Sequence, residues 1–148
     1  MKKFFTLFLL FMAIIVNAQT DEELIKKTVE AEAKALYAGN IEGVRSMWKY
    51  DPKSKQVILI ASSENGFILY FSGEGMALDS NYPPKTTSTF QNYDYQIKVS
   101  GNLGFARYST IETKSDGTKS HAFRTDLLEK VGKEWKIIGV TKQGYIPK

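Results

Sequence analysis

Apolar residues recur at helical spacing in the first part of the chain beyond residue 20. They fall every three or four positions, as on one face of a helix: Ile25, Val29, Ala33, Leu36 and Tyr37. Thr20 followed three residues later by Glu23 has the pattern of a capping box, which starts a helix. Gly39 favours the left-handed conformation that commonly ends one. The pattern therefore predicts a helix from about residue 21 to residue 38.

A second, shorter helix is predicted directly afterwards. Asn40 is a favoured N-cap residue. The apolar positions that follow share one helical face: Ile41, Val44, Met47 and Trp48. Asp51-Pro52 stops the helix, because the residue before a proline avoids helical backbone angles.

From residue 56 onward the apolar period changes from 3.6 to 2, which is typical of strands. The strands are expected over residues 56–62, 67–71, 93–99, 103–112, 118–130 and 134–143. Turn pairs separate consecutive strands: Asn65-Gly66, Gly101-Asn102, Asp116-Gly117 and Gly132-Lys133. Residues 72–92 are rich in Gly, Pro, Ser and Thr, so they are expected to form a long loop. Two helices followed by a curved antiparallel sheet form an α+β domain.

The first eighteen residues have the pattern of a secretory signal peptide. Met1-Lys2-Lys3 is basic, residues 4–16 are apolar apart from one threonine, and Val16-Asn17-Ala18 offers a cleavage site. An uncleaved anchor is the alternative, but the apolar run is shorter than the ~20 residues needed to cross a bilayer as a helix. We expect an exported protein, periplasmic or secreted, with residues 19–148 as one domain.

Composition excludes several kinds of chemistry. The chain has no cysteine and one histidine, which excludes a disulfide scaffold and a cysteine nucleophile and disfavours a zinc site. Removal of residues 1–18 lowers the net charge from +4 to +2, and the lysines alternate with acidic residues, which disfavours nucleic acid as a partner. We expect no metal and no cofactor, and no stable membrane anchor after cleavage.

Three stretches of the sequence resemble the NTF2-like superfamily, in particular its SnoaL-like and DUF4440-type members. They are residues 38–44 (AGNIEGV), 99–106 (VSGNLGFA) and 127–137 (LLEKVGKEWKI). The resemblance implies a cone-shaped, cystatin-like fold with a pocket at its wide end, and homodimers through the outer face of the sheet. The superfamily includes cyclases, isomerases, dehydratases and proteins without catalysis. Thr141 and Gln143 stand where many members carry histidine and serine, which disfavours catalysis.

The predicted turns also assign side chains to the two faces of the sheet. If Asp116-Gly117 is a two-residue turn, Arg107 lies opposite Asp126. The same reasoning at Gly132-Lys133 places Arg124 opposite Thr141. One face, expected to line the pocket, then carries these residues: Phe105, Arg107, Ser109, Arg124, Asp126, Leu128, Trp135, Ile137, Thr141 and Gln143.

The polar members of that face form the candidate ligand site. They are expected to act together with two aromatic residues of the helices: Arg107, Ser109, Arg124, Asp126, Thr141, Gln143, Tyr37 and Trp48. A guanidinium would bind an anionic group in a two-pronged contact, and aromatic rings suit an amphipathic ligand. The plainer alternatives are a solvated ion pair between Arg107 and Asp126 and core packing of the aromatic rings.

Three functions remain open on the sequence alone. The first is a non-catalytic domain that binds a small amphipathic or anionic molecule. The second is an enzyme with Asp126 as base, supported by Arg107 or Tyr37, or with His121 oriented by Glu112; the pair of His121 and Glu112 could equally be solvated. The third is a homodimer through an apolar patch on the outer face: Tyr108, Phe123, Leu127 and Val140.

Overall fold

Two helices and six strands make up the described part of the chain. The computed structural model describes residues 19–49, 57–62, 68–72 and 87–147. Both predicted helices are present, α2 (Asp21–Tyr37) and α3 (Ile41–Met47). The capping box of α2 is formed, since the backbone N–H of Glu23 donates to Thr20 Oγ1 at 3.2 Å and the Thr20 N–H donates to Glu23 Oε2 at 3.0 Å. No helix within the described ranges is long and apolar enough to span a membrane.

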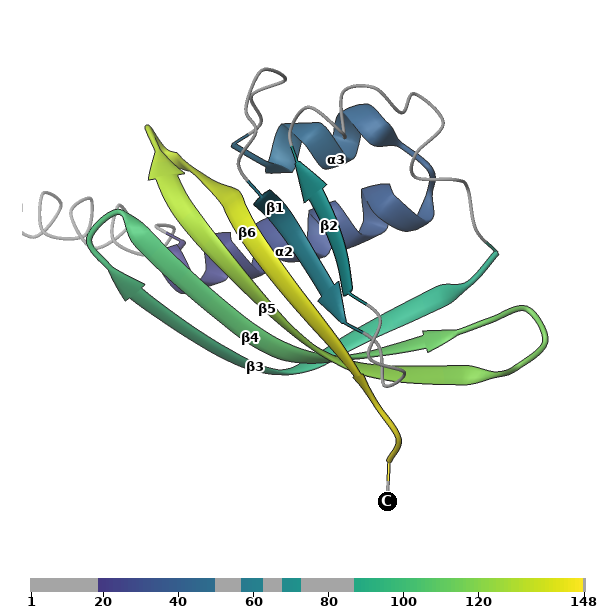
Figure 1. Cartoon of the computed structure of the whole chain (residues 1–148). Helices are drawn as coiled ribbons and strands as arrows, with labels where there is room; N and C mark the ends of the chain where they lie inside the picture. Colours follow the sequence, from purple (N-terminus) through teal and green to yellow (C-terminus); the bar gives the residue numbers. More distant parts are fainter. Residues whose placement is uncertain (1–18, 50–56, 63–67, 73–86, 148) are drawn as a thin grey trace, which may run out of the picture.

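The strands form one mixed sheet. They are β1 (Val57–Ser62), β2 (Ile68–Ser72), β3 (Thr89–Ser100), β4 (Leu103–Thr113), β5 (Lys119–Val131) and β6 (Glu134–Tyr145), in the order β2-β1-β6-β5-β4-β3. All neighbours are antiparallel except β1 and β6, which are parallel. Figure 1 shows α2 lying along the concave side of the bent β3–β6 sheet, with α3 beside it. The predicted α+β class is thereby confirmed, with one parallel pair added.

Some predicted features fall outside the described residues, and one loop boundary was wrong. The Asn65-Gly66 turn and most of the expected 72–92 loop lie outside them. Residues 89–92, predicted as the end of that loop, belong to β3 and pair with β4. The pairing of β1 with β2 that the turn implied is present.

The turn between β4 and β5 is longer than the predicted two residues. Thr113 pairs with Lys119, and the loop between them closes through a bond from the Lys114 N–H to the Thr118 carbonyl. Gly117 has a φ of +83°, the left-handed geometry that ends a three-residue hairpin loop. The extra loop residue shifts the register by one, so Arg107 lies opposite Thr125 and Asp126 lies opposite Ala106.

A bulge between β5 and β6 produces a second shift. Leu128 pairs with Ile137 as predicted, but Leu127 pairs with Gly139, so Ile138 is the extra residue. Beyond the bulge Arg124 lies opposite Lys142, not opposite Thr141. A third irregularity interrupts β3 between Tyr93 and Gln96, next to Asp94 with its φ of +54°.

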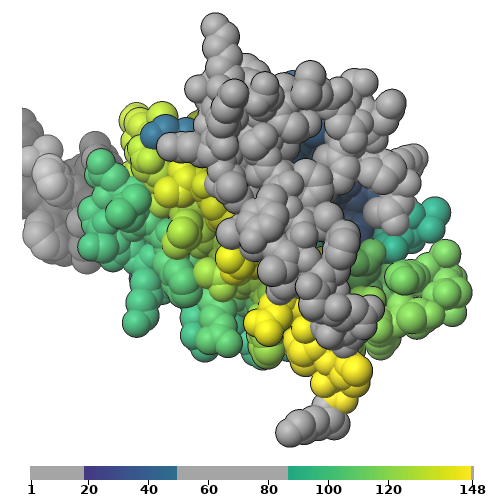
Figure 2. All heavy atoms as spheres, viewed as in Figure 1, coloured from purple at the N-terminus to yellow at the C-terminus, as the bar shows by residue number. Residues whose placement is uncertain are grey.

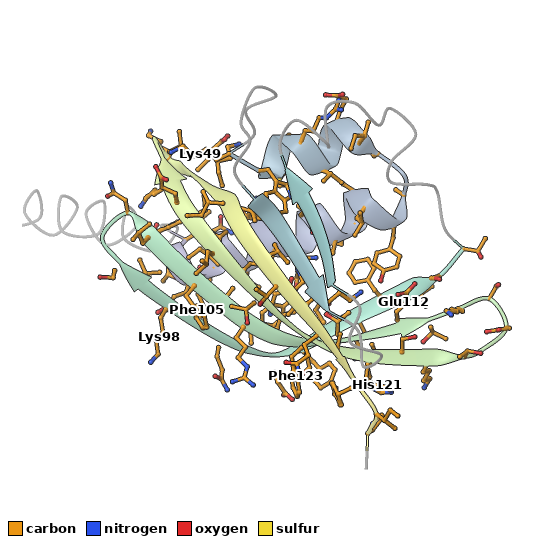
Figure 3. All side chains as sticks on the ribbon, viewed as in Figure 1. Lys49, Lys98, Phe105, Glu112, His121 and Phe123 are labelled. Carbon is orange, nitrogen blue, oxygen red and sulfur yellow. The ribbon has the colours of Figure 1, made fainter. Side chains whose placement is uncertain are left out.

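These shifts redistribute the predicted pocket face between the two sides of the sheet. Its polar members in the second half of β5, Arg124 and Asp126, face the helices, whereas Phe105 and Arg107 of β4 are on the outer face. In Figure 3, Phe105 and Phe123 project from the convex side and Glu112 lies on the concave side. The prediction of one shared face was wrong because a one-residue slip turns every following side chain to the opposite side.

The core lies between α2, α3 and the concave face. It is built from these buried side chains: Ile25, Val29, Val44, Trp48, Ala106, Tyr108, Leu128, Trp135, Ile137 and Val140. Gly104 on β4 allows α2 to approach closely, because a Cβ there would lie 2.5 Å from Ile25 Cδ1 and 3.0 Å from the Trp135 ring. The contact of helix and sheet therefore depends on a residue without a side chain.

We predict that Gly104→Ala destabilises the fold by about 1–3 kcal/mol, because the added methyl overpacks a closed core. Gly139→Ala is the matched control, since a Cβ there meets only Leu127 Cδ1 at 3.9 Å. Chemical unfolding followed by circular dichroism measures both variants. Equal stability of the two would show that Ile25 yields without cost.

Candidate functional site

The concave face of the sheet changes from apolar to polar along its length. One end, which we call the Gly132 end, carries the β3–β4 and β5–β6 turns and is lined by Leu128, Trp135 and Ile137. The other, the Gly117 end, carries the β4–β5 turn. Most of its concave positions are polar, and Phe90 and Ala122 are the apolar residues among them; the polar ones are Asn92, Thr110, Glu112, Arg124 and Lys142. A fold filled only by packing would carry apolar residues at both ends.

Arg124 joins two buried carboxylates at the centre of this face. Its Nε donates to Asp126 Oδ1 at 2.8 Å, and its Nη2 donates to Glu32 Oε2 of α2 at 2.9 Å. Tyr108 donates its hydroxyl to the other oxygen of Asp126 at 2.9 Å. Asp126 is fully buried and Tyr108 is 1% exposed. The guanidinium thus ties α2 to the sheet through charge-assisted bonds.

Glu32 was not among the predicted site residues, although the sequence holds a signal for it. The residue lies seven positions after Ile25 and three after Val29, on the apolar stripe of α2. A carboxylate at a core position needs a buried partner, and Arg124 is that partner. The signal was a charged residue inside an apolar helical pattern.

The two aromatic residues predicted to cover the site both lie at it. Trp48 is buried, and its indole N–H donates to Glu32 Oε1 at 3.4 Å. Tyr37 stacks on Phe90 with ring centroids 4.7 Å apart, and burial together with the nearby Glu112 carboxylate raises the pKa of its hydroxyl. Trp48 belongs to the packed network, whereas Tyr37 is half-buried at the Gly117 end.

Burial shifts the pKa values of the network. It raises the pKa of the Asp126 carboxyl, with Glu32 acting in the same direction and Arg124 and Tyr108 opposing it. Burial also raises the pKa of the Tyr108 hydroxyl. The pKa of the Lys142 ammonium is lowered, first by burial, while Glu112 acts against that shift. These directions follow from the poor solvation of charge inside the fold.

The arrangement limits what Asp126 can do as a base. Both of its oxygens accept hydrogen bonds from protein groups, and the side chain has no exposed surface. A base must reach the proton that it removes. In this geometry Asp126 holds Arg124 and Tyr108 in place. The hydroxyl of Tyr37 and the side chains of Glu112 and Lys142 are nearer the Gly117 end of the face.

The remaining predicted site residues lie on the other side of the sheet. These are Arg107, Ser109, Thr141 and Gln143. Arg107 stacks over Phe123, 5.4 Å from the ring centroid, and so contributes nothing to the concave face. Of the eight predicted site residues, the structure brings Arg124, Asp126, Tyr37 and Trp48 to the helix side of the sheet and places these four on its outer face.

The predicted pair of His121 and Glu112 is also wrong. His121 pairs with Ile111, on the outer face, and Glu112 pairs with Ser120. The His121 ring lies 5.7 Å from the ring of Tyr145. Among the residues described, no group of three histidine or acidic side chains is arranged to hold a metal ion.

We predict that Arg124→Met lowers the free energy of unfolding by about 3–5 kcal/mol at pH 7, because two buried carboxylates lose their counter-charge. The loss should shrink as the pH falls from 7 towards 4. A carboxyl whose folded pKa is raised binds more protons in the folded state than in the unfolded state, so acid stabilises the fold in that window.

Urea unfolding of both proteins at several pH values measures this change. Arg107→Met is the matched control, since that exposed guanidinium lies over the Phe123 ring and has no ion-pair partner in the described part of the chain, so its loss should cost under about 1 kcal/mol. A deficit independent of pH would contradict the assignment of Asp126 as a buried carboxyl with a raised pKa.

Comparison with known proteins identifies the fold of the chain. No protein-family model matches the chain, and no curated protein matches it in sequence. Solved structures do. The hub of CaMKII from S. rosetta has a TM-score of 0.67 at 12% identity, covering 87% of this chain and 100% of that one.

Two further structures have somewhat lower TM-scores. An NTF2-like protein from Cytophaga hutchinsonii has a TM-score of 0.64 at 10% identity, over 86% of this chain and 100% of that chain. A ketosteroid isomerase-like protein from Erwinia carotovora atroseptica has a TM-score of 0.58 at 14% identity, over 88% and 100%. Together with the helices on a bent sheet, these similarities show that the chain has the NTF2-like fold, also described as cystatin-like.

Proposed function

We propose that this protein is an exported, non-catalytic domain that binds a small amphipathic molecule on the concave face at the Gly117 end. One observation carries the proposal, the change of that face from apolar to charged and hydroxyl-bearing along its length. Binding sites for small molecules combine apolar walls with a few placed polar groups. The sequence stretches discussed above favour the SnoaL-like and DUF4440-type members of the fold.

The charges of the face favour a ligand with an uncharged polar group. Arg124 already forms ion pairs with Glu32 and Asp126, so its positive charge is neutralised and attracts a further anion only weakly. Among the described residues of this face, Glu112 adds a third carboxylate and Lys142 adds a second cation. An anionic ligand would add to an excess of negative charge, which is costly where burial weakens screening.

Binding without chemistry is supported by the state of Asp126. The carboxylate is enclosed by its partners, so a catalytic role would first require Arg124 or Tyr108 to move. The alternative is a cyclase, isomerase or dehydratase type of enzyme that uses Asp126 as its base, and a similar structure is named as ketosteroid isomerase-like. Asp126→Asn would separate the two, since only the enzyme would lose turnover while retaining its ligand.

Export is supported by the basic start and apolar run of residues 1–18. The N-cap residue of α2 is Thr20, two positions after the proposed cleavage at Ala18. Cleavage there leaves the capping box of α2 intact.

Native mass spectrometry of the protein purified from its exported compartment tests both claims. We expect the mass of residues 19–148 plus a reproducible extra mass from a bound compound. Tyr37→Phe keeps the stack on Phe90 and removes the hydroxyl at the Gly117 end, so it should weaken binding of that compound about five- to tenfold.

Tyr93→Phe is the matched control, because that tyrosine is on the outer face, where its hydroxyl lies 3.5 Å from the Tyr145 hydroxyl. It should leave binding unchanged. Equal affinity of the Tyr37→Phe variant and the unchanged protein would contradict a site at the Gly117 end. A protein that starts at Met1 after export would contradict cleavage.

Self-association through the outer face is a second candidate function. Phe123 and Leu127 are 38% and 48% exposed there, and Phe123 stacks on Tyr145 at 4.4 Å. Strands β3–β6 form the lower side of the molecule in the space-filling view (Figure 2). The predicted patch needs a correction, since Tyr108 and Val140 are buried on the concave side at 1% and 4% exposure.

We predict that Phe123→Asp combined with Leu127→Asp converts a homodimer to monomers, because charge replaces the apolar centre of the patch. Light scattering after size exclusion measures the mass. Ile146→Asp, at an exposed apolar residue beyond the end of β6, is the control and should leave the dimer intact. A monomeric unchanged protein, or a dimer that survives both substitutions, would reject this interface.

A further inference from the structure

A second concave surface lies outside the sheet, at the Gly132 end. It is a half-open groove of about 230 Å³ between α2, the end of α3 and the β5–β6 turn. Figure 1 shows the start of α2 and the β5–β6 turn on the same side of the molecule. The groove is lined by Leu24, Lys27, Thr28, Ala31, Met47, Lys133, Glu134, Trp135 and Lys136. None of these belongs to the site proposed above.

The α2 wall of the groove follows from helical spacing. Leu24, Thr28 and Ala31 lie four and three residues apart, so they share a stripe beside the core stripe of Ile25 and Val29. The Thr28 hydroxyl donates to the Leu24 carbonyl at 3.0 Å, so its donor is satisfied within the helix.

The floor is apolar and held in position. Trp135 is 2% exposed, and its indole N–H donates to Asp21 Oδ1 at 3.0 Å, which fixes the ring. Lys130 binds the same carboxylate oxygen at 2.6 Å. Met47 contributes a flexible side chain on the α3 side, a type that adapts to different apolar shapes.

The rim carries an excess of positive charge. Lys136 is engaged, with its ammonium 2.6 Å from Glu134 and donating to the Ser46 carbonyl at 2.8 Å. Lys27 and Lys133 have no ion-pair partner among the described residues. An apolar floor beneath two available ammonium groups suits a molecule with an apolar body and a carboxylate.

We propose that this groove binds a small amphipathic anion, namely a carboxylate on a compact aromatic or branched aliphatic body. The volume is below the 300–1,000 Å³ typical of drug-sized ligands, which favours a ligand of about ten heavy atoms. The apolar body packs against Leu24, Met47 and Trp135, while Lys27 and Lys133 contact the carboxylate. The carboxylate of this ligand distinguishes it from the uncharged polar ligand proposed for the concave face.

Phenylacetate is a suitable probe, with phenylacetamide and phenethylamine as neutral and cationic analogues of similar size. Titrations followed by NMR should shift the Trp135 indole N–H and the Met47 methyl group saturably, with a Kd of the order of 1 mM for so few atoms. The affinity should fall from acid to amide to amine. Raising the salt from 0.02 to 0.5 M should weaken only the acid.

Lys27→Gln and Lys133→Gln should each weaken phenylacetate binding about three- to fivefold. The matched controls are Lys26→Gln, whose ammonium lies over the Tyr95 ring, and Lys114→Gln in the other hairpin loop. Both controls should bind as the unchanged protein does. Ala31→Leu should block the groove, and Ala31→Ser should not, with NMR dispersion reporting that both are folded.

The proposal is overturned if no groove signal shifts saturably, if acid and amide bind equally, or if Lys26→Gln acts like Lys27→Gln. Shifts confined to Tyr37 and Phe90 would also overturn it, and would instead place the probe on the concave face. Because the two sites are read from different residues, failure of one leaves the other to be judged by its own signals.

Discussion

One buried guanidinium determines how the helix layer is attached to the sheet. Arg124 on β5 is bound to Asp126 of its own strand and to Glu32 of α2, and Asp126 is also bound by Tyr108 of β4. Burying these charges costs solvation that only their mutual contacts offset. The network therefore holds α2 in one position over the sheet, because any other position would leave a carboxylate unpaired inside the fold.

The same network separates the two kinds of surface that the fold offers. On its Gly132 side the concave face is apolar and filled, with Gly104 admitting Ile25 of α2. On its Gly117 side the face carries hydroxyl, amide and charged groups. Arg124 already pairs with two carboxylates, so the described part of the concave face carries more negative than positive charge. The groove outside the Gly132 end instead has two lysines, Lys27 and Lys133, without an ion-pair partner among the described residues. The proposed ligands of the two sites accordingly differ in charge.

The outer face has a chemistry of its own. Arg107 lies over Phe123, Phe123 stacks on Tyr145, and Leu127 stays exposed on the same strand. Exposed apolar and aromatic side chains that gather on one sheet face are typical of a protein–protein contact surface. A guanidinium predicted to hold a ligand inside the cone instead forms part of this outer surface.

The sequence by itself determined the elements and much of the core. Helical spacing, the Thr20–Glu23 capping box and the alternating strands each depend on neighbouring residues, and the structure confirms them. Four of the eight residues that it grouped, Arg124, Asp126, Tyr37 and Trp48, lie on the helix side of the sheet. What only the tertiary structure decided was which side of the sheet the other polar residues occupy. One extra residue in the Gly117 loop and one at Ile138 reverse the alternation. Neither extra residue can be recognised in the local sequence pattern, because a hairpin loop of two residues and one of three can both end in glycine.

The partner of Glu32 was likewise decided by tertiary structure, since 92 positions separate it from Arg124 and only packing brings them together.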